Sequence, residues 1–533
     1  MTRRRRVWAV AGIGLLAATL CAPTVQGAPS PSTASILPNR PLALGSPGLS
    51  ESRTVQQLGP GVRLTQIVRG EASDDEYWTI TVKVDGQLLG DRSAAADIAA
   101  QVKAAGLTPR IDQIDNPKYH DQPNGTLGWR VRVGEYPSSD AAQDDVATLK
   151  AADLSPTVDW TGDDGAPITG PWRIDVVTVD RNRVGDVRAT YGTAINGREK
   201  TSDMSAADGA LAAINAGFFA TTAKDGFPGE PSGLGVYAGH LRSEAANGRT
   251  ALVLNGNRAR LTPVSSALSV RSDDGARREV DGVDRKPGII HLCGGVGGDE
   301  PTEQPRHAGP NCTDPSELIL NDNALGADVD AEQPAVEAVL DDKGRVGEVR
   351  EPGGAVPDNG KVLLGTGDAA DWLREHAKVG QRLRFGTRLT DAAGNTVPLT
   401  QRSHLVGGGP MLIKNGRTFI NARAEGDSVD DTPSFVYSFG MRRNPRTMVG
   451  VDAAGRLLLV TVDGRQPGYS VGTSFTEQAR LMQSLGAVSA MNLDGGGSTA
   501  TVVHGKIINS PSDAAGERAV GDALEVLPCG CNG

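Results

Sequence analysis

The alternation of apolar and polar residues predicts a small domain made of one repeated unit over residues 76–162. Residues 77–84 alternate with the period of a half-buried strand, and residues 94–105 have the spacing of a helix that ends at Gly106. The order strand, helix, strand then returns once, and two such βαβ-like units form a small α/β sandwich. The other predicted elements are a strand at 109–114, a strand at 129–133, a helix at 139–152 and a strand at 157–160.

Strands dominate the pattern from Gly170 onward, which predicts a large, strand-rich α+β domain over residues 170–528. Two helices stand out, at residues 205–212 and at residues 474–485, and Gly486 ends the second. Glycine is abundant, at 68 of 533 residues, which favours many turns and strands over long helices. The predicted strands are 172–179, 251–254, 335–340, 345–349, 361–364, 448–451 and 457–462.

Residues 1–28 have the pattern of a secretory signal peptide: four consecutive arginines, an apolar run over residues 7–22 and small residues up to Ala28. The run is short for a spanning helix, and a retained membrane anchor is the alternative. Residues 29–75 are rich in Pro, Ser and Gly without sustained periodicity, which predicts a flexible linker. We therefore expect a secreted protein, extracellular or associated with the cell wall, with no membrane contact after the signal is removed.

Four cysteines follow the predicted signal peptide, and an even number in an exported chain suggests disulfides with three alternative pairings. A bridge between Cys293 and Cys312 would close the glycine- and proline-rich stretch 294–312, which is predicted to be a surface loop. Cys529 and Cys531 are too close in sequence for a relaxed mutual bridge. The cysteines and their neighbouring histidines do not follow the spacing of a zinc site.

The formal net charge of −10 argues against nucleic acid as a partner, because such partners need a broad basic surface. The same charge argues against adhesion to anionic lipid or to bulk anionic polymer by charge alone. Any anionic substrate must therefore be held locally, by a few arginines or by backbone amides.

Three glycine-rich segments of the large domain, residues 214–219, 406–413 and 491–500, are candidates for close contact with a ligand. Glycine permits positive φ and lets backbone amides approach anionic oxygens. One such segment alone is better explained as a tight turn or bulge, but three in one domain favour a binding site. The predicted substrate-binding residues here are Asn215, Gly217, Phe218, Phe219, Gly408, Gly409, Asn492, Gly495, Gly496, Gly497 and Ser498.

Other catalytic motifs are missing from the sequence. It has no nucleotide phosphate loop and no dinucleotide fingerprint. Ser498 lacks the second glycine of a nucleophile elbow, because Ala500 stands there, and the seven histidines are scattered. Carboxylates assisted by Arg, Asn and amides remain, a combination that suits glycosyl or phosphoryl chemistry.

Asp494 is the predicted catalytic carboxylate, and a strand-end aspartate that bonds neighbouring amides is its alternative role. Asp463 and Glu517 are second carboxylates that could act as acid or base. A guanidinium can hold two phosphate oxygens in a fixed fork, whereas ordinary surface salt bridges are the alternative for each arginine. The candidate phosphate ligands are Arg446, Arg465 and Arg518.

The first domain resembles the SPOR domain family in residues 129–136, in Ala141 and Ala142, and in residues 149–152. The resemblance implies binding of peptidoglycan glycan strands through the face of the sheet. An unrelated small α/β domain is the alternative.

The large domain resembles the phosphodiester glycosidase family over residues 172–527, in the segments around the three glycine-rich sites and the three arginines. The resemblance implies hydrolysis of a sugar-1-phosphate diester at the glycosidic bond, which leaves a phosphomonoester on the aglycone. One departure is Asp522, where we expect Asn, and its extra negative charge would weaken phosphate binding or alter substrate choice.

Asp494 is accordingly assigned to the sugar as nucleophile, base or electrostatic stabiliser of an oxocarbenium-like transition state. No cofactor is expected, although a divalent cation is left open. The expected partners are peptidoglycan and a sugar-phosphodiester substrate in a wall glycopolymer or exopolysaccharide. Two alternatives are a non-catalytic wall- or polysaccharide-binding protein, and a metal-dependent phosphodiesterase with Asp463, Asp494 and Asp513 as ligands.

Overall fold

The computed structural model describes residues 36–182, 186–246, 248–291, 300–301, 310–329, 331, 334–428 and 433–528, all in the unit that begins at Ser35. The predicted signal peptide, the stretch 294–312 for the most part, and Cys293, Cys529 and Cys531 lie outside these ranges, so the disulfide predictions stay predictions. Within the described ranges, no helix has the length and apolar character needed to cross a membrane.

An eight-stranded antiparallel sheet carries the candidate catalytic strand β30, in the order β1-β2-β7-β29-β28-β30-β26-β27. Strand β29 alternates between two cores, with Leu457 and Leu459 in one and Leu458 and Val460 in the other. Burial on both faces explains why this strand is a continuous apolar run in the sequence. The strands are β1 (Glu51–Gly59), β2 (Val62–Arg69), β7 (Trp172–Val179), β29 (Leu457–Val462), β28 (Arg446–Asp452), β30 (Ala487–Asn492), β26 (Met411–Lys414) and β27 (Arg417–Thr418).

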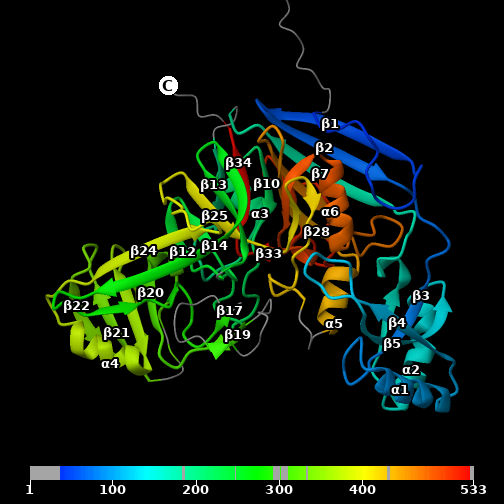
Figure 1. Ribbon diagram of the computed structural model, residues 1–533, viewed down its shortest axis with the longest axis horizontal. Coiled ribbons are helices and arrows are strands. Elements are labelled where there is room, and N and C mark those ends of the chain that lie inside the picture. The colour runs from blue at the N-terminus through cyan, green and yellow to red at the C-terminus, as the bar shows by residue number, and fades with distance from the viewer. Residues whose placement is uncertain are drawn as a thin grey trace, which may run out of the picture. The chain divides into compact units, whose positions relative to one another are not determined.

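The prediction of a flexible linker over residues 29–75 is wrong for most of the described part, because β1 and β2 lie within it. They form a hairpin, and β2 pairs with β7 in antiparallel register, with Leu64 opposite Val177 (Figure 1). The preceding segment is also ordered, since Leu42 and Leu44 are buried in the same core as Trp172. The prediction failed because Pro, Ser and Gly dominate the composition of the stretch, while a few well-spaced apolar side chains are enough to anchor it.

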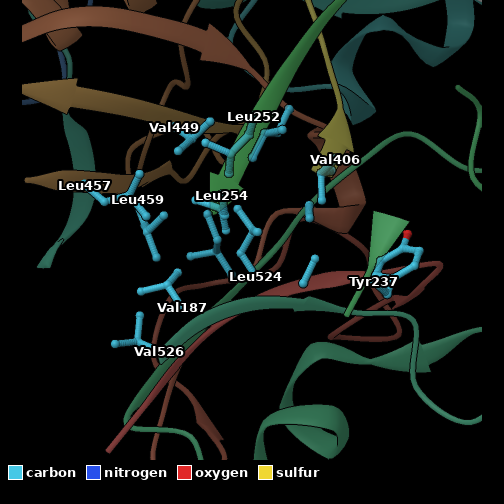
Figure 2. Close-up of a cluster of buried hydrophobic side chains, with 14 of the residues drawn as sticks. Val187, Tyr237, Leu252, Leu254, Val406, Val449, Leu457, Leu459, Leu524 and Val526 are labelled. Atoms are coloured by element: carbon cyan, nitrogen blue, oxygen red, sulfur yellow. The ribbon is translucent and has the colours of Figure 1, made fainter. Parts of the chain in front are cut away.

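Two further sheets pack against the eight-stranded sheet and enclose a hydrophobic cluster. Figure 2 shows side chains of this cluster, among them Leu254, Val449, Leu459 and Leu524. The first sheet contains β32 (Lys506–Ile507), β31 (Thr501–Val503), β10 (Ala212–Asn215), β34 (Ala523–Leu527) and β8 (Asp186–Thr190). The second contains β12 (His240–Ser243), β11 (Gly235–Tyr237), β25 (Ser403–Gly407), β13 (Thr250–Asn255), β14 (Arg258–Arg271) and β15 (Arg277–Glu279), with β24 (Arg384–Asp391) beside β14.

A smaller subdomain packs helix α4 (Gly367–His376) on a five-stranded sheet with its own hydrophobic cluster. Its strands are β16 (Gly282–Val283), β20 (Leu318–Asp322), β23 (Lys361–Thr366), β21 (Ala335–Leu340) and β22 (Val346–Arg350). The predicted strands of this region are confirmed to within two residues, whereas α4 was not predicted. Short strands complete the described chain: β17 (Ile290–His291), β18 (Glu300–Pro301), β19 (Pro310–Thr313), β9 (Glu199–Lys200) and β33 (Ala519–Val520).

The N-terminal domain has the predicted repeat, with six elements at the expected places. Its four-stranded antiparallel sheet has the order β4-β5-β3-β6, the arrangement of a split βαβ fold. Helices α1 and α2 share a hydrophobic cluster with β3 and β5, so they cover one face of the sheet. The elements are β3 (Trp78–Val82), α1 (Arg92–Ala104), β4 (Pro109–Asp115), β5 (Thr126–Tyr136), η1 (Asp140–Ala142), α2 (Gln143–Ala151) and β6 (Pro156–Trp160), followed by η2 (Thr161–Asp163).

Helix α6 (Phe475–Ser484) confirms the predicted helix at 474–485. Ser474 and Glu477 form a reciprocal capping box that satisfies backbone donors at its first turn. The other predicted helix is displaced: α3 covers Thr201–Ala207, and residues from Ala212 already belong to β10. Three short helical segments border the candidate site, α5 (Pro433–Phe435), η4 (Val436–Met441) and η5 (Gly496–Ser498).

Candidate active site

The three glycine-rich segments meet at the end of β30. The backbone N–H of Gly409 donates to the carbonyl of Asn492 at 2.9 Å, and the Nδ2 of Asn492 donates to the carbonyl of Gly409 at 2.8 Å. The N–H of Asp494 donates to the carbonyl of Ala216 at 3.0 Å. Segments that lie almost 300 residues apart are therefore joined around one aspartate, as the sequence indicated.

The buried side chain of Asn215 makes hydrogen bonds to the Asp494 loop and to a neighbouring strand. Its Nδ2 donates to the carbonyl of Asp494 at 2.7 Å, while its Oδ1 accepts from the Thr447 hydroxyl at 2.6 Å and from the Ala500 N–H at 3.1 Å. Asn215 is fully buried, so it acts by positioning the loop and not by touching a ligand.

The glycines after Asp494 are required for different reasons. Gly496 has a φ of +60°, which favours glycine. A Cβ on Gly497 would collide with the side chains of Arg518 and Asp513, and a Cβ on Gly495 would lie 2.8 Å from the carbonyl of Pro445. Glycine at these positions therefore lets two arginine-bearing segments approach the candidate catalytic loop closely.

Asp494 lies partly buried on the wall of a cavity of about 540 Å³. Burial raises the pKa of its carboxyl from 3.8 to about 6. The Ser498 hydroxyl, the Gly495 N–H and the charges of Arg518 and Arg446 oppose this shift by favouring the ionised form. At neutral pH the carboxyl is therefore mostly ionised, as nucleophilic attack requires, and its pKa lies close enough to 7 for proton transfer.

Arg446 is a buried cation on the same wall. Its Nε donates to the carbonyl of Thr473 at 3.1 Å, and its guanidinium lies over the rings of Phe475 and Phe439 at 4.8 and 5.2 Å. Among the described residues, no carboxylate lies within 4.0 Å of it. Burial lowers the pKa of Arg446 to about 9, and the positive charge of Arg465 adds to the shift. A buried cation without an ion-pair partner is a ready binding site for an anion.

Arg465 and Arg518 complete a cluster of three guanidinium groups. Arg465 donates to the Oδ1 of Asn444 at 2.7 Å, and burial lowers its pKa. Arg518 is half-buried and pairs with Asp513 at 2.7 Å. All three line the cavity with Asp494, which gives a carboxylate beside a positively charged pocket.

Several cavity residues were not predicted. Arg442, Arg443 and Asn444 directly precede the Pro445-Arg446 pair, and this unbroken polar run was the signal that could have revealed them. The aromatic residues Phe435 and Phe439 come from α5 and η4. A second group comes from the N-terminal domain and its η2 turn, and no sequence signal indicates it: Trp78, Val158, Asp159, Trp160 and Asp163.

Comparisons with known proteins identify two related families and a similar solved structure. A model of the phosphodiester glycosidase family matches residues 334–527, and a model of the SPOR domain matches residues 88–160. A solved protein of Burkholderia pseudomallei, described as a "putative exported protein", is 32% identical, and the match covers 93% of this chain and 100% of that chain with a TM-score of 0.84. The chain contains a phosphodiester glycosidase domain and a SPOR domain.

The curated relatives match over a shorter range. The N-acetylglucosamine-1-phosphodiester alpha-N-acetylglucosaminidase of Mus musculus is 32% identical over 165 residues, 30% of this chain and 30% of that protein. The chain therefore spans about a third of the length of this relative. A hypothetical protein from Synechocystis, 18% identical with a TM-score of 0.52 over 90% of this chain and 81% of its own, shares the fold.

Two predicted catalytic carboxylates lie outside the cavity. Glu517 accepts hydrogen bonds from the N–H and hydroxyl of Ser202 at 2.9 and 2.6 Å, so it anchors the start of α3. Asp463 accepts from the Nδ2 of Asn509 at 2.9 Å and from the N–H of Ser510 at 3.1 Å, with both oxygens occupied. These contacts correct the prediction, because neither carboxylate faces the pocket where a substrate would bind.

The remaining predicted residues of the candidate site do not line the cavity. Gly217 donates its N–H to the Oδ1 of Asp522 at 2.7 Å, and Tyr237 donates its hydroxyl to the Oδ2 at 2.9 Å. Asp522 therefore fixes the loop 215–219 and does not face phosphate. The following residues, like Asn215, are not on the cavity wall: Gly217, Phe218, Phe219, Gly408, Gly409, Asn492 and Ser498.

The carboxylates named for the metal-dependent alternative are held by other partners. Asp463 bonds Asn509 and Ser510, and Asp513 pairs with Arg518. Within the part of the chain that the structure describes, no group of three or more His, Cys, Asp or Glu residues is arranged to bind a metal ion.

Proposed function

We propose that this glycosidase hydrolyses a sugar-1-phosphodiester at the bond between the anomeric carbon and the phosphate oxygen. The observation that carries the proposal is that Asp494 and Arg446 line the same cavity while Arg446 is buried and has no carboxylate within 4.0 Å among the described residues. An anionic phosphodiester would supply that partner and would place its sugar beside a carboxylate.

The reaction follows from the charges. As the glycosidic bond breaks, its electron pair goes to the phosphate oxygen, which the three arginines stabilise. The sugar acquires positive charge at the anomeric carbon, which ionised Asp494 stabilises or attacks. Water then supplies the new hydroxyl at that carbon, and its proton leaves to solvent or to the phosphate. A phosphomonoester is already a stable anion, so the leaving group needs little help from an acid.

The cell envelope is the proposed place of action. The predicted signal peptide, the SPOR domain and the description of the Burkholderia pseudomallei relative as exported support this part of the proposal. The proposed substrates are therefore phosphodiester-linked sugars of a wall glycopolymer or exopolysaccharide, with peptidoglycan nearby.

The test is to incubate the purified chain with a panel of sugar-1-phosphodiesters and to measure free sugar. We expect release by the wild type and a fall of about 10²- to 10⁴-fold for Asp494→Asn. Asp371→Asn, a change of the same type at an exposed site on α4, is the matched control and should leave the rate unchanged. Sugar phosphate as the product, or full activity of folded Asp494→Asn, would contradict the proposal, and binding without turnover would indicate the non-catalytic alternative.

A further inference from the structure

Of the three candidate phosphate ligands, Arg518 alone is paired with a carboxylate in the part of the chain that the structure describes. Its Nε donates to the Oδ2 of Asp513 at 2.8 Å, and its Nη2 lies 2.7 Å from the same oxygen. Neither Arg446 nor Arg465 has a described carboxylate within 4.0 Å. Arg518 lines the cavity and Asp513 does not, so the carboxylate contacts the arginine from outside the pocket.

This ion pair packs directly on the candidate catalytic loop. A Cβ on Gly497 would collide with both Arg518 and Asp513, so the absence of a side chain there lets the pair approach the residues after Asp494. The charge of Asp513 also acts on a second arginine. Burial lowers the pKa of Arg465, the charge of Arg518 adds to this shift, and the charge of Asp513 opposes it. Asp513 therefore influences two of the three guanidinium groups that face the cavity.

The other two arginines on the cavity wall supply no unpaired positive charge. Arg442 pairs with Asp159 at 3.1 Å and with Asp163 at 3.6 Å. Arg443 pairs with Glu477 at 2.6 Å. The positive charge that a bound phosphate meets therefore comes from the three candidate phosphate ligands, and a carboxylate beside one of them changes a large share of it.

The proposed reaction changes the charge of the group that these arginines hold. A phosphodiester carries one negative charge, whereas a phosphomonoester carries nearly two above its second pKa of about 6. Hydrolysis at the anomeric carbon gives the hydroxyl of water to the sugar and leaves the phosphomonoester among the arginines. Because Coulomb energy scales with the charge of the bound ion, unopposed arginines would hold this product more tightly than the substrate. A fixed carboxylate repels the dianion about twice as strongly as the monoanion.

We propose that Asp513 is a specificity-determining residue that lowers the affinity of the phosphate pocket for the dianionic product relative to the monoanionic diester. It acts from outside the cavity wall, through its own charge and through Arg518, and it is a positioning residue and not a catalytic one. The inference rests on the proposed function for the identities of substrate and product. It adds a reason why the phosphomonoester leaves a pocket lined by arginines, a step that sets the turnover rate of many enzymes.

Equilibrium binding at pH 8 separates this inference from catalysis. The full chain is titrated calorimetrically with dimethyl phosphate, a monoanion, and with methyl phosphate, which is mostly a dianion at this pH. In Asp513→Asn we expect the affinity for dimethyl phosphate to rise about threefold and the affinity for methyl phosphate to rise about tenfold, because the second ligand carries about twice the charge. A residue with a merely structural role would not change the ratio of the two affinities.

Two variants serve as controls, and thermal unfolding should show that every variant is folded. Asp513→Glu keeps the charge and should bind both ligands like the wild type. Asp371→Asn removes a carboxylate from an exposed pair with Arg374, away from the cavity wall, and should leave both affinities unchanged.

Three results for folded Asp513→Asn would overturn the proposal: unchanged affinities, equal changes for the two ligands, or a fall in both affinities. An equal response of Asp513→Glu and Asp513→Asn would also overturn it, since only one of them removes the charge. Lack of binding of either ligand to the wild type would overturn both this inference and the proposed function. The expected charge-dependent response in a protein that releases no free sugar would refute the proposed function and keep the role of Asp513.

Discussion

The side-chain amide of Asn215 lies 2.7 Å from the backbone carbonyl of Asp494, and this hydrogen bond joins β10 to the loop after β30. Because the Oδ1 of Asn215 also accepts from Thr447 and Ala500, one buried side chain connects three segments behind the catalytic carboxylate. The geometry of Asp494 therefore depends on a residue that never reaches the substrate.

Replacing Asn215 by Ala should lower kcat more than it raises KM, because it displaces Asp494 without removing a substrate contact. We expect a fall in kcat of about 10- to 100-fold and a loss of about 1–3 kcal/mol in the free energy of unfolding. Steady-state kinetics and urea unfolding measure both. Asn509→Ala, which removes another loop-linking amide away from the cavity, should cost similar stability with little loss of kcat. Equal losses of kcat in the two variants would contradict a specific role for Asn215.

The raised pKa of Asp494 predicts that this residue destabilises the fold at neutral pH. Its pKa is about 6 in the folded chain against the ordinary 3.8 of an aspartate, so folding favours the protonated form. Below about pH 4 the carboxyl is protonated in both the folded and the unfolded chain, and it costs no stability. As the pH rises, the ionised carboxylate lowers the free energy of unfolding, and this loss is complete above about pH 6. Asp494→Asn, which mimics the protonated acid, should therefore be about 1–3 kcal/mol more stable than the wild type at pH 8 and less so at pH 4.5. Urea unfolding at the two pH values measures this, and an unchanged gap would show that the carboxyl is not perturbed.

Arg446→Lys should weaken anion binding although it keeps a positive charge. The planar guanidinium bonds the carbonyls of Thr473 and Phe439 while it lies over two aromatic rings, a geometry that an ammonium group does not reproduce. Calorimetry with methyl phosphate should show an affinity loss of at least about tenfold. Arg456→Lys, at a half-exposed pair with Asp452, is the control and should bind like the wild type. Equal affinities of the three proteins for methyl phosphate would contradict the assignment of Arg446 as a phosphate ligand.

Glu517→Gln should affect stability and leave chemistry nearly intact. Glu517 anchors Ser202 at the start of α3 and is not on the cavity wall, so its loss should cost about 1 kcal/mol with kcat within a few-fold of the wild type. Thermal unfolding and free-sugar release check the two parts. A fall in kcat as large as that of Asp494→Asn, in a folded protein, would restore Glu517 as a catalytic acid or base.

Much of the fold could be predicted because its signals are local. The six elements of the SPOR domain, α6 with its Ser474 cap and the buried strand β29 all lie where periodicity and capping placed them. The hairpin of β1 and β2 could not be predicted in this way, because a few apolar side chains anchor it to β7 and the composition around it is that of a linker.

The candidate site was predictable only in part. Glycine density indicated the catalytic loop, and Arg446, Arg465 and Arg518 do line the cavity. Asp463 and Glu517 resemble catalytic carboxylates in sequence, but their hydrogen bonds to Asn509 and Ser202 appear only in three dimensions. The wall formed by the SPOR domain could not be predicted, because it depends on how two domains pack and not on any local motif.

The most direct test of the central claim is to carry out the hydrolysis in water labelled with ¹⁸O and to locate the label by mass spectrometry. The substrate is a phosphodiester of N-acetylglucosamine. If Asp494 stabilises or attacks the anomeric carbon, the label enters the free sugar and the phosphomonoester stays unlabelled. The Asp494→Asn variant then forms neither product. Label in the phosphate, with sugar phosphate as a product, would show attack at phosphorus and would contradict the assignment of this site to a glycosidase reaction.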